Sequence, residues 1–227
     1  MNRSATITLD PHSVIVFQGN SITDAGRNRL QMEANALPGL GQGYPRLIAQ
    51  QLLGQDPENH YQIYNRGVSG DTLPDLVQRW EQDTLPLLPD LVSVLIGVND
   101  LWQALNTVGK LDLNRFQALY RGLLETTRRA CPYTRLVLCE PFLLPVGGTP
   151  DAWMGDVREL GKVTRTLAAD FSAVFVPFQQ ALDRTAAATE PRNLLSDGVH
   201  PTPHGHRVLA ECWLEHVLGN ERAGEVE

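Results

Sequence analysis

A short apolar run near the middle of the chain, residues 91–96 (LVSVLI), constrains the fold more than any other stretch. It is rich in leucine and β-branched residues and lies between Pro89 and Gly97. A run without polar alternation is typical of a strand covered on both faces, and such strands occur in parallel sheets with helices on either side. The run therefore predicts the central strand of an α/β domain.

Four other short runs have the character of strands, and segments with helical spacing separate them. The expected strands are residues 14–17, 61–65, 91–96, 135–139 and 173–176. The expected helices are residues 44–53, 72–82, 113–130, 156–170, 178–188 and a last one ending near residue 218. This alternation predicts a three-layer α/β/α sandwich, flavodoxin-like, whose five-stranded parallel sheet has right-handed crossovers. We expect one domain over residues 1–218, a polar tail over 219–227, and long loops over 25–43 and 143–155.

Charge and cysteine content narrow the choice of partner and compartment. The net charge is −7 without any block of basic residues, which argues against a nucleic-acid partner. Cys131, Cys139 and Cys212 lack metal-ligand and CxxC spacing, so reduced thiols are favoured over a disulfide framework. The chain has no apolar run long enough to span a membrane, and its first residues do not resemble a secretion signal. These features predict a cytoplasmic protein.

Polar residues follow several of the expected strands. Ser21 follows the first strand, Gly70 lies in the turn after the second, and Asn99 follows the third. Asp197 and His200 lie in the loop before the last helix. Because ligands of open α/β sheets bind outside the carboxyl ends of the strands, we expect these five positions to share one edge. Ester hydrolysis requires a hydroxyl, a base, a group that orients the base, and donors for the oxyanion, and the five positions offer each of these.

Taken singly, each of these residues has a structural interpretation. Ser21 is as suited to capping a helix as to catalysis, and the glycines and the Asn99–Asp100 and Asp197–Gly198 pairs are common turn residues. His200, His204 and His206 raise the alternative of a zinc site, but no Cys or carboxylate at ligand spacing accompanies them. A nucleotide or flavin site is a further alternative, although the chain lacks GxGxxG and P-loop motifs. We expect no cofactor and no metal.

Four motifs together resemble the blocks of the SGNH hydrolases, the GDSL-like esterases and lipases. GNSITD, NRGVSGDT, GVND and DGVHP occur in the order of that family and extend over nearly the whole chain. The resemblance implies that Ser21 is the nucleophile, that His200 is the base and that Asp197 orients it. It also implies an oxyanion hole made by the backbone N–H groups of Ser21 and Gly70 and the side-chain amide of Asn99.

The chain departs from the family at Asn20, where the family has an aspartate before the nucleophile. Asparagine keeps an acceptor oxygen of similar shape but loses the charge. The departure changes the hydrogen bonds around Ser21. Asn20 is also a candidate for binding the substrate. Because the base and its orienting carboxylate are retained, we expect the chain to be active.

The segments SITDAGR, GQGY and GVNDLW are most similar to cytoplasmic bacterial members that act as acetyl esterases on xylan-derived or other acetylated sugars. The resemblance implies a small acyl pocket and a homo-oligomer, and Trp102 and Trp153 are candidates for lining the site or stacking on a sugar. Simple packing of these tryptophans is the alternative. Other functions left open are a lipase, a lysophospholipase or a thioesterase of the same fold, and a non-catalytic carbohydrate-binding protein.

Overall fold

The computed structural model describes residues 6–147 and 151–219. Within them five parallel strands form one sheet in the order β2-β1-β3-β4-β5. The strands are β1 (Val14–Gly19), β2 (Gln62–Asn65), β3 (Leu91–Leu95), β4 (Arg135–Cys139) and β5 (Val174–Val176). The first strand of the chain, β1, thus lies between β2 and β3. The strand order reverses direction at β1. This is the α/β sheet that the sequence predicts.

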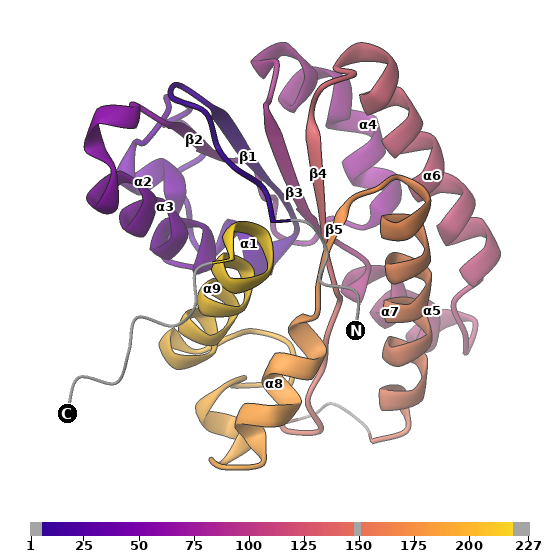
Figure 1. Cartoon of the computed structure of the whole chain (residues 1–227). Coiled ribbons are helices and arrows are strands. Elements are labelled where there is room, and N and C mark those ends of the chain that lie inside the picture. Colours follow the sequence, from indigo (N-terminus) through magenta and orange to yellow (C-terminus); the bar gives the residue numbers. More distant parts are fainter. Residues whose placement is uncertain (1–5, 148–150, 220–227) are drawn as a thin grey trace.

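The helices cover both faces of the sheet (Figure 1). On one face lie α2 (Leu37–Leu40), α3 (Tyr44–Gln55), α8 (Phe178–Ala186) and α9 (Pro203–Leu218). On the other lie α4 (Leu73–Asp83), α5 (Val98–Thr107), α6 (Leu113–Ala130) and α7 (Trp153–Asp170). A four-residue helix, α1 (Ser21–Asp24), follows β1, and the single-turn 3₁₀ helices are Pro57–Asn59, Leu85–Leu87 and Pro191–Asn193.

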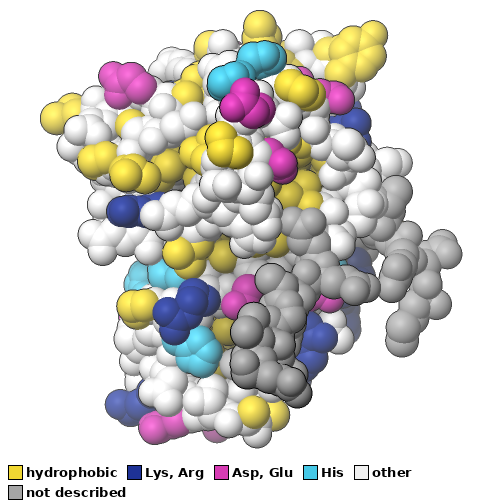
Figure 2. All heavy atoms as spheres, turned by 60° about the vertical axis from the view of Figure 1, so that its left-hand side comes forward, with side chains coloured by type: hydrophobic (Ala, Val, Ile, Leu, Met, Phe, Trp, Pro, Cys, Tyr) yellow, Lys and Arg dark blue, Asp and Glu magenta, His cyan; other side chains and the backbone are white. Residues whose placement is uncertain are grey.

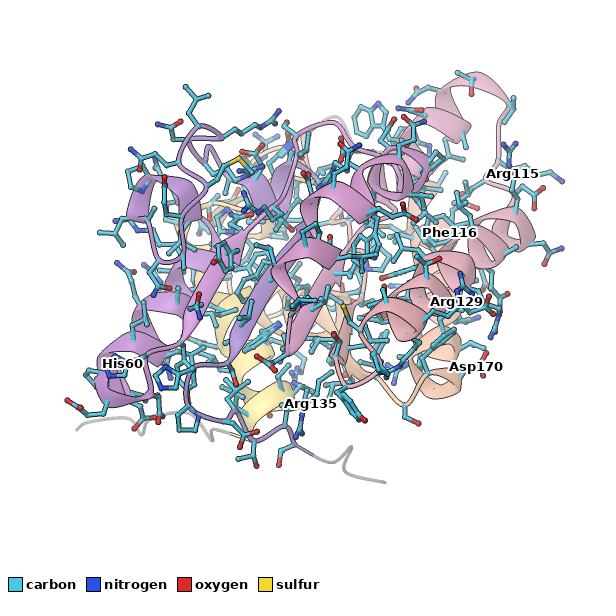
Figure 3. The ribbon with its side chains drawn as sticks, turned by 90° about the horizontal axis from the view of Figure 1, so that it is seen from above. His60, Arg115, Phe116, Arg129, Arg135 and Asp170 are labelled. Atoms are coloured by element: carbon cyan, nitrogen blue, oxygen red, sulfur yellow. The ribbon has the colours of Figure 1, made fainter. Side chains whose placement is uncertain are left out.

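The core lies on both sides of β3, as the LVSVLI run predicts. Every residue of β3 is buried, and its only polar side chain, Ser93, accepts a hydrogen bond from Trp213 Nε1 at 3.0 Å. The outer layer is amphipathic: on α6, Phe116 is buried while Arg115 and Arg129 are exposed, as the view from above shows (Figure 3). Burial of the apolar helix faces therefore holds each layer against the sheet.

Three expectations differ from the structure. Helix α5 occupies residues for which the sequence analysis predicts no element, and α2 lies inside the expected loop 25–43. The expected loop 143–155 ends earlier, because α7 begins at Trp153. Residues 148–150 of that loop, and the expected tail except for Gly219, lie outside the described residues.

The state of the cysteines and the character of the helices bear on two expectations from the sequence. Cys131, Cys139 and Cys212 are all free and buried. Burial raises the pKa of the Cys139 thiol to about 12, which keeps it protonated. Among the described residues, no helix combines the length and the apolar character that a bilayer-spanning segment requires.

Candidate active site

Ser21 is presented by an abrupt turn at the carboxyl end of β1. Gly19 ends the strand at φ +155°, and a Cβ placed there would lie 2.3 Å from the Leu95 carbonyl oxygen, so only glycine fits against β3. Asn20 then caps α1, because its Oδ1 accepts a hydrogen bond from the Ile22 N–H at 3.2 Å. Ser21 is the first residue of this helix and follows the carboxyl end of β1, which lies between β2 and β3 in the sheet.

The loop before α9 brings His200 to Ser21. Ser21 Oγ lies 3.0 Å from His200 Nε2, and His200 Nδ1 lies 2.7 Å from Asp197 Oδ2. The same carboxylate accepts the backbone N–H groups of Val199 and His200 through Oδ1. With Nδ1–H directed to a carboxylate, Nε2 is the acceptor that faces the serine hydroxyl.

Asp197 is held as a carboxylate. Burial by itself would raise the pKa of Asp197, but the hydrogen bonds from His200 and Val199 outweigh it and lower the pKa below its usual value. An ionised Asp197 favours the imidazole orientation described above and stabilises the positive charge that His200 acquires when it takes a proton.

Two backbone amides and one side-chain amide follow the carboxyl ends of β1, β2 and β3 and are candidates for binding an oxyanion. Within the described residues, the N–H groups of Ser21 and Gly70 have no acceptor. Gly70 has φ +93°, a conformation that favours glycine. Asn99 Nδ2 donates one of its two hydrogens to the Asp71 carbonyl at 2.9 Å, and no described group takes the other. These are the donors an oxyanion requires.

Asp24 joins α1 to the Gly70 turn, a role that the sequence analysis misses. Its carboxylate accepts the Ser69 N–H at 3.0 Å and is paired with Arg29. Arg27 Nε donates to the Gly67 carbonyl at 2.6 Å, so α1 and its following loop hold both ends of the turn. The signal was available in SITD, where the aspartate lies one helical turn after Ser21.

Arg79 of α4 is a second functional candidate that the sequence analysis misses. Its guanidinium donates to the carbonyls of Gly19 and Arg66, at 3.2 and 2.9 Å, and to Asp71 Oδ2 at 2.7 Å. Gln18 Oε1 and Asp83 Oδ2 complete its partners. Arg79 thus connects the ends of β1 and β2 to Asp71, whose carbonyl orients Asn99. No local sequence signal marks this arginine, because its partners come from three separate elements.

Asp100 anchors the start of α4. Both of its oxygens lie 3.0 Å from the Leu73 N–H. Burial raises the pKa of Asp100 to about 6, although this hydrogen bond opposes the shift. Asp100 follows Asn99 directly, so the same short segment supplies an amide to the site and an anchor to α4.

Three sequence-predicted substrate positions have other surroundings. Asn20 is fully buried, so its side chain is a helix cap and is not open to a substrate; its Nδ2 has no partner among the described residues. Trp102 is 43% exposed and packs edge-to-face on Trp153, with ring centroids 5.2 Å apart. Trp153 is the first residue of α7 and not part of a loop. A substrate role for the tryptophan pair stays a prediction.

A cavity of about 290 Å³ begins at the serine and the histidine. Its walls include Ser21, Ile22, Gln42, His200, Pro203 and His206. His206 is in the first turn of α9, as is His204. Over residues 6–147 and 151–219, no three His, Cys, Asp or Glu side chains are grouped so that they could hold a metal ion.

Comparison with known proteins decides the family. The model of the GDSL-like lipase/acylhydrolase family matches residues 17–208. The chain belongs to this family. It is 32% identical over 208 residues to an acetylxylan esterase of Geobacillus stearothermophilus, an alignment that covers 89% of this chain and 93% of the relative.

Solved structures of GDSL-like proteins have the same fold. A protein of Parabacteroides merdae assigned to the GDSL-like lipases superimposes with a TM-score of 0.90 at 39% identity, covering 93% of this chain and 98% of the other. The Geobacillus acetylxylan esterase gives 0.85 at 30% identity, covering 96% and 100%. The SGNH hydrolase fold expected from the motifs is confirmed, and this GDSL-like protein is a carboxylic ester hydrolase. The individual roles of its site residues stay predictions.

Proposed function

We propose that this chain is a serine esterase that hydrolyses small acyl esters, chiefly acetyl esters of sugars or xylo-oligosaccharides. The observation that carries the proposal is the line from Ser21 Oγ through His200 to Asp197, with separations of 3.0 and 2.7 Å. The Gly70 N–H, which has no acceptor in the described residues, supports it. The likeness to an acetylxylan esterase supports the acetyl group and the sugar.

In the proposed reaction, Ser21 Oγ attacks the ester carbonyl carbon as His200 Nε2 takes the hydroxyl proton. The carbonyl oxygen becomes an oxyanion, which the N–H groups of Ser21 and Gly70 and the free hydrogen of Asn99 Nδ2 stabilise. The C–O bond of the alcohol then breaks, the alcohol oxygen receives the proton from His200, and Ser21 carries the acyl group.

A water molecule completes the cycle. His200 removes a proton from the water, whose oxygen attacks the acyl carbon, and the second oxyanion uses the same donors. The acyl–Ser21 bond breaks, the proton returns to Ser21 Oγ, and the carboxylic acid leaves. Every proton transfer passes through His200, so Asp197 acts by orienting it.

A panel of esters tests both the reaction and the acyl preference. We expect kcat/KM for p-nitrophenyl esters to fall from acetyl to octanoyl, and acetylated xylose to be hydrolysed. Ser21→Ala should lose turnover of all of them while its circular dichroism spectrum stays unchanged. A higher kcat/KM for octanoyl esters would contradict the small acyl pocket and favour the lipase alternative, and full activity of Ser21→Ala would contradict the nucleophile.

We also propose that the protein is a cytoplasmic homo-oligomer whose partner is a small-molecule ester, not a nucleic acid or a membrane. The free, buried cysteines support a reducing compartment. Leu30 and Met32, which precede α2, and Leu37, the first residue of α2, are exposed, and Leu30 is 90% exposed. Figure 2, which brings the side of β2 and α2 forward, shows apolar side chains grouped between polar ones on this face. Light scattering during size-exclusion chromatography should give a mass above the monomer's 25.1 kDa, and cell fractionation tests the compartment.

A further inference from the structure

The geometry of the site distinguishes the place of the alcohol from that of the oxyanion. The oxyanion must face Gly70 and Asn99, whereas the alcohol oxygen must lie close to His200 Nε2, from which it receives its proton. The cavity of about 290 Å³ opens at Ser21 and His200, and its described walls include neither Gly70 nor Asn99. Its volume is close to the lower end of ligand pockets, about 300 Å³. It is therefore placed and sized for a small alcohol.

His206 is bound to the protein through one ring nitrogen, and its side chain lines this cavity. Its Nδ1 accepts the Tyr44 N–H at 3.2 Å. A Cβ on Gly43 would come within 2.9 Å of Cε1, so the ring lies directly against the backbone before α3. The ring also lines the cavity, and Nε2 is not one of the fully buried side-chain nitrogens that lack a partner, so this nitrogen keeps access to solvent. No group in the described parts of the chain pairs with Nε2.

The contact with Tyr44 also determines the protonation of His206. An Nδ1 that accepts a backbone hydrogen bond carries no proton, so the neutral ring carries its hydrogen on Nε2. Burial, and next the nearby His200, lower the pKa of His206 to about 4. At neutral pH, His206 is thus a fixed, uncharged donor, in contrast to the exposed His200.

The remaining walls suit an alcohol with both polar and apolar parts. Ile22 and Pro203 are apolar, and exposed Gln42 adds a side-chain amide without a partner in the described residues. A single buried donor beside apolar surface is the kind of arrangement that orients a ligand in a mostly apolar pocket.

We propose that this cavity binds the alcohol part of the ester and that His206 Nε2–H donates a hydrogen bond to a second oxygen of that alcohol. The ligand class is an alcohol with a ring oxygen or neighbouring hydroxyl, such as a sugar residue. The inference rests on the proposed esterase function and adds a specificity residue to it. His206 takes no part in proton transfer.

Two His206 variants separate the effect of the Nε2–H donor from the effect of the contact between His206 and Tyr44. In His206→Asn, the amide oxygen can replace Nδ1 toward Tyr44, but the donor at the Nε2 position is lost. In His206→Gln, the longer side chain keeps a donor toward the cavity and loses the Tyr44 contact. His204→Asn, two residues away and outside the cavity walls, is the matched control. Each is assayed with tetrahydropyran-3-yl acetate and cyclohexyl acetate, which differ by one ring oxygen.

We expect the wild type to prefer the oxygen-containing acetate, with a kcat/KM ratio of about tenfold, because a neutral hydrogen bond contributes on this scale. His206→Asn should reduce the ratio to about one, while His206→Gln and His204→Asn retain it. The inference is overturned if the wild type shows no preference, a result that needs no variant to fold, or if His206→Asn keeps the preference. If no acetate is hydrolysed by the wild type, the proposed function fails first, which is a distinct outcome.

Discussion

Asp197 holds His200 by three hydrogen bonds, one to the ring and two to the backbone of the loop that carries it. A loop histidine on its own would sample several rotamers and both tautomers. The carboxylate restricts both, so the position of Nε2 relative to Ser21 is a property of the whole Asp197–His200 turn. The pair is local in sequence, which is why its geometry is predictable from three-residue spacing.

The variant Asp197→Asn should therefore lose activity while keeping its fold. The amide can still accept the backbone hydrogen bonds, but it does not stabilise a charged imidazole and favours the wrong tautomer. We expect kcat to fall by about 10³–10⁴-fold with KM changed little. Steady-state kinetics with p-nitrophenyl acetate measure this, and a loss below tenfold would show that His200 does not depend on Asp197.

At the scale of elements, the site is built from strand ends, and Arg79 of α4 binds the backbone at two of them. Arg79 donates to the carbonyls at the ends of β1 and β2, and its contact with Asp71 fixes the carbonyl that orients Asn99. A planar guanidinium can serve several acceptors at fixed angles, whereas an ammonium group cannot. Arg79 is a positioning residue, since it acts on the oxyanion donors through the backbone.

For Arg79→Lys we predict a fall in kcat of about 10–100-fold with KM nearly unchanged, because displaced donors weaken oxyanion stabilisation more than ground-state binding. The control is Arg129→Lys on α6, an exposed arginine whose side chain bonds only to Thr126 Oγ1 among the described residues. A purely structural role of Arg79 would instead lower the melting temperature and leave kcat per folded molecule unchanged.

Some elements of this fold are predictable from the sequence and others are not. The strand at 91–96 was predictable because its apolar run is continuous and ends at Gly97. Helix α5 was not, because Asn99–Asp100 has the signature of a turn and only Val98, Asp100 and Leu101 of the helix are buried. Its position depends on contact with α7, where a Cβ on Gly97 would lie 2.9 Å from Leu160. The roles of Arg79 and His206 are unpredictable for the same reason, because the groups around them come from segments distant in sequence.

At the scale of the whole molecule, the buried Asp100 links stability to pH. The pKa of its carboxyl is raised to about 6 in the folded protein, from 3.8. Between these values the unfolded chain loses the Asp100 proton before the folded protein does. The folded state then binds more protons, so this group lowers the free energy of unfolding as pH rises from about 4 to 6.

Replacing this carboxyl should remove that part of the pH dependence. A shift of about two pKa units corresponds to at most about 3 kcal/mol. We expect the free energy of unfolding of Asp100→Asn, minus that of the wild type, to increase by about 2–3 kcal/mol between pH 4 and pH 7. Urea unfolding at several pH values measures it. A difference that stays constant with pH would contradict the raised pKa.

The central claim is that Ser21 is a nucleophile activated by His200, and covalent labelling tests it most directly. The wild type is treated with a small organophosphonate ester, the intact mass is measured, and the labelled peptide is identified. We predict one adduct per chain, on Ser21, with none in Ser21→Ala or in urea-unfolded wild type. A folded wild type that hydrolyses acetyl esters but takes up no label at Ser21, or labels at another residue, would contradict the account.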